Sequence, residues 1–301
     1  MGLNGLSEIF SYKLVCSFAS LKDAQIVPMK KQKPFYGKGI HVDENELKNA
    51  MQIAGWTLPS EILLYLSEYE KKFIEMEFTG KRTLNYYHNR LEGLGFFSLE
   101  NVIDAGCGMG QWAIALSDLN RCIYGVDINT ARLFIATEIS QTMQKNNIQY
   151  QFSSLEKLPF KDSSMDGIFC YGVFMFTQMD MAVKEFYRVL KPGGRVYLNA
   201  NAIGWYIHLF MDICIKEKKI SMMMTILRIL LRTALRKKQN IIISERWLKK
   251  LLKNNGFNII DSGAEGSIQS SNIMKSSIPS AYESTYYGFP GVIEFLAEKV
   301  S

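Results

Sequence analysis

The spacing of apolar positions changes near residue 98, and this change divides the chain into two predicted parts. Between residues 42 and 97 apolar side chains such as Leu47, Met51 and Ala54 recur at helical intervals, which predicts helices. From residue 98 short apolar runs alternate with helical stretches, a pattern typical of a parallel sheet covered on both faces. Residues 1–40 keep no sustained period and predict a loosely organised extension.

The alternating part predicts an α/β fold, a doubly wound, mostly parallel, seven-stranded Rossmann-like sheet with helices on both faces. The expected strands are residues 101–105, 122–126, 148–152, 166–171, 195–200, 257–261 and 292–298. The expected helices are residues 111–119, 130–145, 179–190 and 244–255, the last with Ser244 as its N-cap and Gly256 at its end.

About 40 residues rich in Ile, Leu and Met interrupt this rhythm after the fifth strand. We expect residues 202–241 to form a helical lid, residues 1–97 an N-terminal extension and helical region, and residues 98–201 with 242–301 the core. The longest nearly apolar run, residues 202–215, is shorter than the roughly 20 residues of a membrane-spanning helix.

The net charge of +6 is concentrated rather than spread. Residues 211–253 hold twelve Lys or Arg and three acidic residues, so we expect no general nucleic-acid binding. Arg228, Arg232 and Arg236 recur every four residues beside an apolar surface. This pattern predicts that the lid contacts a membrane or an amphiphilic substrate, the alternative being that it packs on the domain or on a second subunit with its arginines in water. The five cysteines form no C-x-x-C pair and the N-terminus lacks signal-peptide features, so we expect a cytoplasmic protein without a metal site.

The sequence from Asp104 to Gly110 is the strongest chemical signal. An apolar strand ends in an acid and enters the spacing G-x-G-x-G before a helix opens at Gln111. Glycines let a ligand approach the backbone, and the ligand crevice of such a sheet lies at the carboxyl ends of its strands. A dinucleotide site prefers G-x-G-x-x-G and no neighbouring carboxylate, whereas Asp104 suits a ligand with a cationic ammonium.

Residues 104–110, D-A-G-C-G-M-G, resemble motif I of class I S-adenosylmethionine-dependent methyltransferases, and the similarity extends over about residues 83–261. Asp127 matches the acid that binds the ribose hydroxyls in this family. Residues 152–160 resemble the segment that flanks the adenine, with Ser154 where an acid usually stands. Residues 185–194 resemble the family's segment before the fifth strand, which is a signature of the fold.

The resemblance implies S-adenosyl-L-methionine as cofactor. The expected cofactor-binding residues are Asp104, Gly106, Cys107, Gly108, Gly110, Asp127, Ile128, Ser154, Leu155 and Cys170. A side chain added at Gly106 or Gly108 is expected to project into the methionine end of the pocket. The helix before motif I carries Tyr86, Tyr87 and Arg90, which either cover that end of the cofactor or pack in the interior.

The acceptor side is less specified. The candidate catalytic residues are Tyr171, at the carboxyl end of the fourth strand, and His208, in the insert after the fifth, while Phe176 stands where many members of the family have a histidine. Residues 170–173 lack the N-P-P-Y type motif of nucleic-acid methylating members. We therefore expect O-methylation of a small molecule, a sugar, a glycan or a lipid-like acceptor. A non-catalytic subunit with this fold and a dinucleotide-dependent oxidoreductase are the alternatives.

Overall fold

The computed structural model describes residues 41–215, 224, 227, 231, 242–268 and 282–300. The predicted extension at residues 1–40 lies outside these residues, and so does most of the predicted lid, including Arg228, Arg232 and Arg236. Among the described residues, no helix has the length and apolar character needed to cross a membrane.

The N-terminal part is helical, as predicted, and each longer helix begins at a polar cap. Asp43, Ser67 and Thr83 accept hydrogen bonds from backbone N–H groups of the first turns, and Ser67 forms a capping box with Glu70. Trp56 lies between the last two helices, with its ring 4.9 Å from Phe78. The helices are α2 (Glu44–Ile53), α3 (Ser60–Leu63), α4 (Glu68–Phe78) and α5 (Leu84–Gly93).

The predicted doubly wound sheet is confirmed: seven strands lie in the order β3-β2-β1-β4-β5-β9-β6. The first five strands are parallel, and β9 is antiparallel to both of its neighbours. The strands are β1 (Asn101–Ala105), β2 (Cys122–Asp127), β3 (Ile148–Phe152), β4 (Met165–Cys170), β5 (Leu190–Asn201), β6 (Phe257–Ala264) and β9 (Val292–Lys299).

Two expected strands are longer in the structure than the apolar pattern indicates. β5 begins at Leu190 instead of residue 195, because Leu190 pairs with Met165 before a register shift in β4. β6 extends past residue 261 to Ala264, also beyond a register shift. In these added parts of β5 and β6, polar residues and glycines continue the backbone hydrogen bonding between strands. A prediction based on apolar positions does not detect such residues.

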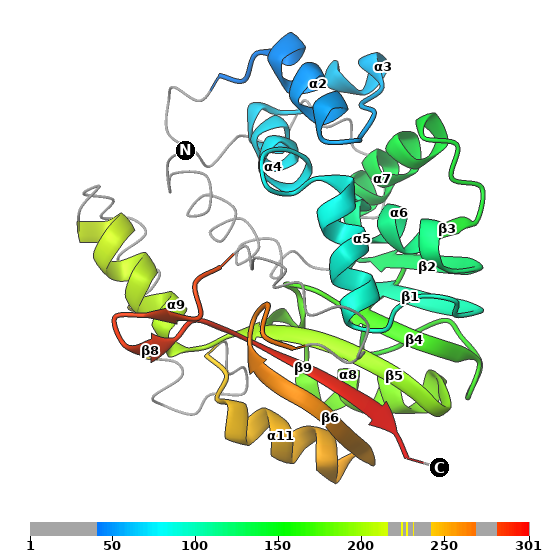
Figure 1. The fold of residues 1–301 in the computed structure, drawn as a ribbon, viewed down its shortest axis with the longest axis vertical. Helices are drawn as coiled ribbons and strands as arrows, with labels where there is room; N and C mark the ends of the chain where they lie inside the picture. Colours follow the sequence, from blue (N-terminus) through cyan, green and yellow to red (C-terminus); the bar gives the residue numbers. More distant parts are fainter. Residues whose placement is uncertain are drawn as a thin grey trace.

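The helices cover both faces of the sheet and enclose two apolar cores (Figure 1). α5 packs on α6 (Gln111–Leu119), and α7 (Thr130–Thr142) contacts β2 and β3, so these helices share one face. α8 (Met179–Val189) and α11 (Glu245–Asn254) cover the other face. The helix bounds agree with the sequence-based prediction to within three residues at each end.

Shorter elements complete the carboxyl edge of the sheet. The described start of the predicted lid is helical, and Gly204 in α9 lets its backbone approach the carbonyls of Phe289 and Pro290, where a Cβ would clash. These elements are η2 (Phe174–Phe176), α9 (Ile203–His208), the π-helix η3 (Leu209–Ile215), β7 (Thr285–Tyr286) and β8 (Phe289–Pro290).

Candidate functional site

The glycine-rich loop turns the chain from β1 into α6 at the carboxyl edge of the sheet. Gly106, Gly108 and Gly110 have φ values of 79°, 55° and 87°, a region that side chains with a Cβ rarely adopt. The N–H groups of Gly106 and Cys107 both donate to the carbonyl of Val126, at 2.8 and 3.0 Å. The loop is therefore tied to the end of β2, where Asp127 lies.

The three glycines have different surroundings. A Cβ at Gly108 would meet no atom within 4 Å, so this position faces open space. A Cβ at Gly106 would lie 2.4 Å from a Cγ of Val173, and one at Gly110 would lie 2.6 Å from the hydroxyl of Tyr150. The expectation that a side chain at Gly106 projects into a ligand space is wrong, because the side chain of Val173 occupies that direction.

Asp104 is a buried carboxyl group with an unsatisfied oxygen. Its side chain lies at the carboxyl end of β1, the residue is 1 % exposed, and Oδ2 has no hydrogen-bond partner among the described residues. Burial, together with the nearby charge of Asp127, raises the pKa of Asp104 to about 8, against a hydrogen bond from the backbone of Ala113. A cationic group beside Oδ2 would donate the hydrogen bond that this oxygen lacks and would balance the negative charge of the carboxylate.

Asp127 holds the open glycine in place. Its Oδ2 accepts from the backbone N–H of Gly108 at 3.0 Å, and its Oδ1 accepts from that of Asn129 at 2.8 Å. The next residue, Ile128, has 53 % of its surface exposed although it is apolar. Asp127 and Ile128 thus offer a carboxylate and an apolar surface beside the open space at Gly108.

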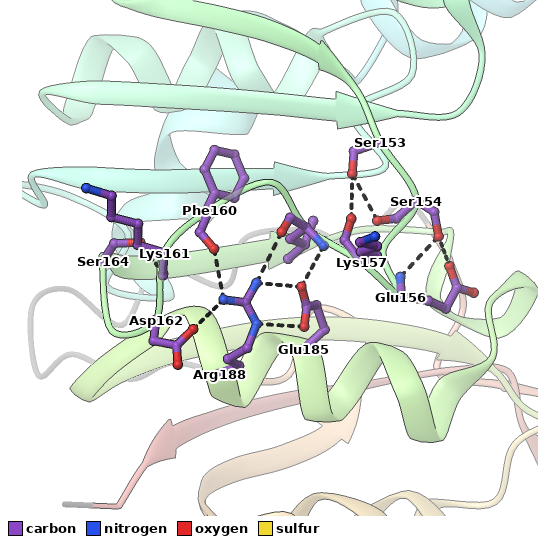
Figure 2. A network of polar contacts seen from close by, with 11 residues as sticks. Ser153, Ser154, Glu156, Lys157, Phe160, Lys161, Asp162, Ser164, Glu185 and Arg188 are labelled. Carbon is purple, nitrogen blue, oxygen red and sulfur yellow. Dashed lines mark hydrogen bonds and ion pairs between the residues drawn. The ribbon is translucent and has the colours of Figure 1, made fainter.

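The segment after β3 completes this side of the site. The backbone N–H of Ser153 donates to the carbonyl of Asp127 at 3.1 Å, so the segment begins beside β2. Ser154 lies at the position where the family resemblance implies an acid, and its hydroxyl donates to the Glu156 carboxylate (Figure 2). Leu155 is buried. The carboxylate of Glu156, two residues later in the chain, therefore places an acidic group next to Ser154.

Arg188 and Glu185 on α8 fix the rest of this segment (Figure 2). Arg188 donates to the carbonyls of Leu158 and Phe160 at 3.1 and 2.9 Å, and it pairs with Glu185 at 2.6 Å. Glu185 in turn accepts from the backbone N–H of Leu158 at 2.7 Å. Sequence reasoning treated residues 185–194 as a fold signature only, but two of them anchor the loop predicted to flank the adenine.

Two expected cofactor residues are buried thiols. Cys107 and Cys170 are 3 % and 0 % exposed, and burial raises the pKa of the Cys107 thiol well above its usual range. Cys170 ends β4, one residue before the end of the expected strand 166–171. Their side chains pack in the interior, so their contribution to a ligand would come from the backbone.

The two candidate catalytic residues lie in different environments. Tyr171 is half-buried beyond β4, packs against Trp112 with ring centres 4.9 Å apart, and donates to Glu265 at 2.9 Å. His208 is buried on α9, and its ring stacks on Tyr286 with centres 4.4 Å apart. The contacts described for His208 are aromatic, whereas Tyr171 has a carboxylate partner.

The residues on α5 are used for internal contacts. Tyr87 donates to the carbonyl of Glu77 at 2.7 Å, and Arg90 pairs with Glu294 and donates to the carbonyl of Ile268. Tyr86 is also buried, and burial raises its pKa to about 12. Of the two roles considered for these residues, the contacts of Tyr87 and Arg90 fit interior packing.

Sequence reasoning missed two buried acids, Glu265 and Glu294. Glu265 follows β6 and is 4 % exposed, while Glu294 lies within β9 and is 0 % exposed. Glu294 accepts from Tyr197 at 2.8 Å and from the backbone of Ile268 at 2.9 Å. A glutamate inside the apolar run of residues 292–297 was a signal of a buried polar group, but nothing nearby identified its partners.

Residues 103–198 match a family model described as a methyltransferase domain. The uncharacterized methyltransferase YcgJ of Bacillus subtilis (strain 168) is 37 % identical over 98 residues, which are 32 % of this chain and 39 % of that protein. The demethylmenaquinone methyltransferase of Oceanobacillus iheyensis is 31 % identical over 101 residues, 32 % of this chain and 42 % of that protein. The matched part is thus about two fifths of each relative's length.

A solved structure shares the fold over a larger part of the chain. The geranyl diphosphate C-methyltransferase from Streptomyces coelicolor A3(2) superposes with a TM-score of 0.52 at 18 % identity, covering 78 % of this chain and 85 % of that one. At this identity the likeness concerns the fold alone. The fold similarity therefore includes residues on both sides of the matched domain.

Proposed function

We propose that this chain methylates a hydroxyl group of a small or amphiphilic molecule, because residues 103–198 match a methyltransferase domain and residues 104–110 resemble motif I of class I S-adenosylmethionine-dependent methyltransferases. When bound, S-adenosylmethionine supplies a methyl group on a sulfonium as the electrophile. The protein's part in such a displacement is to hold donor and acceptor in line.

The observation that carries the proposal is the unsatisfied carboxyl of Asp104 near the open position at Gly108. The Asp104 carboxylate would bind the ammonium group, and the Asp127 carboxylate would accept hydrogen bonds from the ribose hydroxyls. Ile128 and Leu155 would provide apolar surface for the adenine, with Ser154 and Glu156 as polar partners at its edge. A dinucleotide brings a pyrophosphate, which a carboxylate at Asp104 would repel.

Tyr171 is the first residue beyond β4, at the same edge of the sheet, and we assign it to the acceptor side. The backbone N–H of Gly172 donates to Asn199 at 2.6 Å, which fixes the turn after Tyr171. His208, on α9, remains a second candidate. Its ring contacts that of Trp205, which in turn contacts the ring of Tyr282, and these rings lie at the same edge of the sheet.

Exposed apolar residues support a peripheral contact of the segment 202–241 with a membrane or an amphiphilic acceptor. Ile215, Leu227 and Leu231 are 50 %, 42 % and 60 % exposed. Large apolar side chains on a surface favour contact with lipid or another apolar partner. Co-sedimentation with vesicles of anionic and of neutral lipid tests this contact, and equal failure with both would rule it out.

The primary test is calorimetry with S-adenosylhomocysteine and with NAD, followed by transfer of labelled methyl groups to a panel of acceptors. We expect binding of S-adenosylhomocysteine in the micromolar range or tighter, no binding of NAD, and labelled product from at least one hydroxyl acceptor. Binding without transfer to any acceptor would support a non-catalytic subunit instead. Binding of NAD alone would support an oxidoreductase and reject the proposal.

A further inference from the structure

Tyr171 and Glu265 form a polar pair that the proposed cofactor site does not use. The Tyr171 hydroxyl donates to a Glu265 carboxylate oxygen at 2.9 Å, although 94 residues separate them. Glu265 is buried, whereas Tyr171 is half-buried and keeps part of its surface accessible. The pair therefore connects a residue that is partly exposed to an interior carboxylate.

The topology of the sheet brings this pair to the ligand edge. β4 is parallel to β1, so Tyr171 follows the same end of the sheet as the glycine-rich loop. The backbone N–H of Glu265 donates to the carbonyl of Val292, and Val292 pairs with Asn201 at the carboxyl end of β5. The ring of Tyr171 packs on Trp112 in the first turn of α6, directly after the loop. The pair thus lies on the acceptor side of the proposed cofactor position.

The charges around the pair favour a neutral acceptor. Arg82 pairs with Glu77, and Arg90 pairs with Glu294, so each of these arginines already has a carboxylate. Glu265 is a third carboxylate in this described group, which therefore carries more negative than positive charge. An anionic acceptor such as a phosphate ester would be repelled, whereas a neutral hydroxyl can donate a hydrogen bond to Tyr171.

Aromatic side chains surround the same place. The ring of Trp112 contacts both Tyr171 and Phe169. Arg82 lies over the ring of Tyr282, and Trp205 contacts Tyr282 edge-on at 5.3 Å. Flat apolar surfaces of this kind suit a planar ring. Burial, and then the charge of Glu265, holds the pKa of Tyr171 well above its usual range, so its hydroxyl stays protonated.

We propose that Tyr171 and Glu265 accept the proton from a neutral ring hydroxyl of the acceptor, an inference that rests on the proposed methyl transfer. The acceptor oxygen forms a bond to the methyl carbon as the carbon–sulfur bond breaks and its electron pair stays on sulfur. The acceptor proton passes to the Tyr171 oxygen while the Tyr171 proton passes to Glu265. Tyr171 is the catalytic residue of the pair, and Glu265 positions its hydroxyl and receives the final proton.

The test compares kcat at saturating acceptor for two phenols that differ in acidity, 4-methylphenol and 4-nitrophenol, at pH 8.5, where only the second is largely ionised; because its anion is repelled, we expect 4-nitrophenol to have the higher KM. Tyr171→Phe and Glu265→Gln should each lower kcat for 4-methylphenol by about 100-fold, the usual size of general base catalysis, and for 4-nitrophenol by less than about 5-fold. A merely structural role would lower both rates equally, because it does not depend on the acidity of the acceptor.

Tyr197→Phe is the matched control. Tyr197 also donates to a glutamate, Glu294, at 2.8 Å, but it is 0 % exposed. Its replacement removes the same hydroxyl from the same kind of pair, and it should leave the ratio of the two rates unchanged. Equal effects of Tyr171→Phe and Tyr197→Phe on this ratio would overturn the assignment.

A binding measurement gives a readout without turnover. Wild-type protein saturated with S-adenosylhomocysteine should bind 4-methylphenol more tightly than 4-methylanisole, which has no hydroxyl, and Tyr171→Phe should lose this preference of about 5- to 10-fold. If the wild type shows neither this preference nor turnover of either phenol, the pair has no such role, although the cofactor site stands. Failure to bind S-adenosylhomocysteine would instead reject the proposed function itself.

Discussion

Two buried carboxyl groups at the carboxyl edge of the sheet have opposite surroundings. Glu294, on β9, meets Arg90, Tyr197 and the backbone of Ile268, so its charge and its oxygens are satisfied. Asp104, on β1, has one oxygen without a partner and the repulsive charge of Asp127 nearby. An interior carboxylate with a full set of partners stabilises the fold, whereas one left incomplete is destabilising unless a ligand completes it. This difference separates an acid that stabilises the fold from the acid to which we assign ligand binding.

The largest effect is expected at the satisfied acid. Arg90→Leu should lower the free energy of unfolding by about 3 to 5 kcal/mol, because it removes the cation that offsets the burial of the Glu294 carboxyl group. Urea denaturation measures this loss. The double variant Arg90→Leu with Glu294→Leu should recover most of it, since no lone charge remains. A double variant as unstable as the single one would show that Arg90 contributes by packing and not by pairing.

The second-largest effect is expected at Gly108, the open position near Asp104. Gly108→Val should weaken S-adenosylhomocysteine binding by at least about 100-fold, because a side chain there enters the space assigned to the ligand. Gly193→Val is a matched control, since Gly193 has φ +75° and no atom within 4 Å of an added Cβ, yet lies near the start of β5, at the opposite end of the sheet from the glycine-rich loop. Both variants carry the same kind of backbone strain. Equal affinities in calorimetry would place the ligand elsewhere.

Asp104→Asn should sharpen the comparison by changing stability and binding in opposite directions. Because the folded pKa of Asp104 is raised from 3.8 to about 8, its contribution to stability is complete below pH 3.8 and is lost as pH rises to about 8. At pH 8 the ligand-free variant should therefore be more stable than wild type by about 1 to 3 kcal/mol, and at pH 4 the two should match. S-adenosylhomocysteine should bind the variant more weakly.

Asp118→Asn is the control of opposite sign. Burial opposes ionisation of Asp118, but hydrogen bonds from His88 and Lys145 outweigh it and lower its pKa. This aspartate stabilises the protein above its unfolded pKa, so its replacement should cost stability at neutral pH and not at low pH. If both variants shift stability in the same direction with pH, the raised pKa of Asp104 is wrong.

The burial of Asp104 beside the glycine-rich loop was predictable from sequence and the pairing of Glu294 was not, because the partners of these two acids lie at different distances along the chain. Asp104, Gly108 and Asp127 fall within 24 residues, and the Gly108–Asp127 hydrogen bond spans 19. Strand and loop geometry alone brings such residues together. Arg90 and Glu294 are 204 residues apart, and Tyr171 and Glu265 are 94 apart, so only the completed sheet joins them.

The same reason explains the error at Gly106. Its spacing relative to Gly108 and Gly110 is regular, but the side chain that fills its open direction belongs to Val173, 67 residues later. A motif records which positions need glycine. It does not record which of them face a ligand, because that depends on tertiary neighbours.

The smallest expected effect concerns Arg188, which supports the binding side without touching the proposed ligand. Its side chain is 33 % exposed, so its ion pairs contribute little to stability, but it also donates to two carbonyls of the loop predicted to flank the adenine. Arg188→Met should weaken S-adenosylhomocysteine binding by about 3- to 5-fold through loss of these hydrogen bonds. Arg121→Met is the control, since Arg121 pairs with Glu100 on the exposed surface. Calorimetry should show a loss of affinity for S-adenosylhomocysteine in Arg188→Met and no loss in Arg121→Met. Equal affinities would mean that α8 does not set the shape of the loop. In that case Leu155 and the Ser154–Glu156 contact would hold the loop without Arg188.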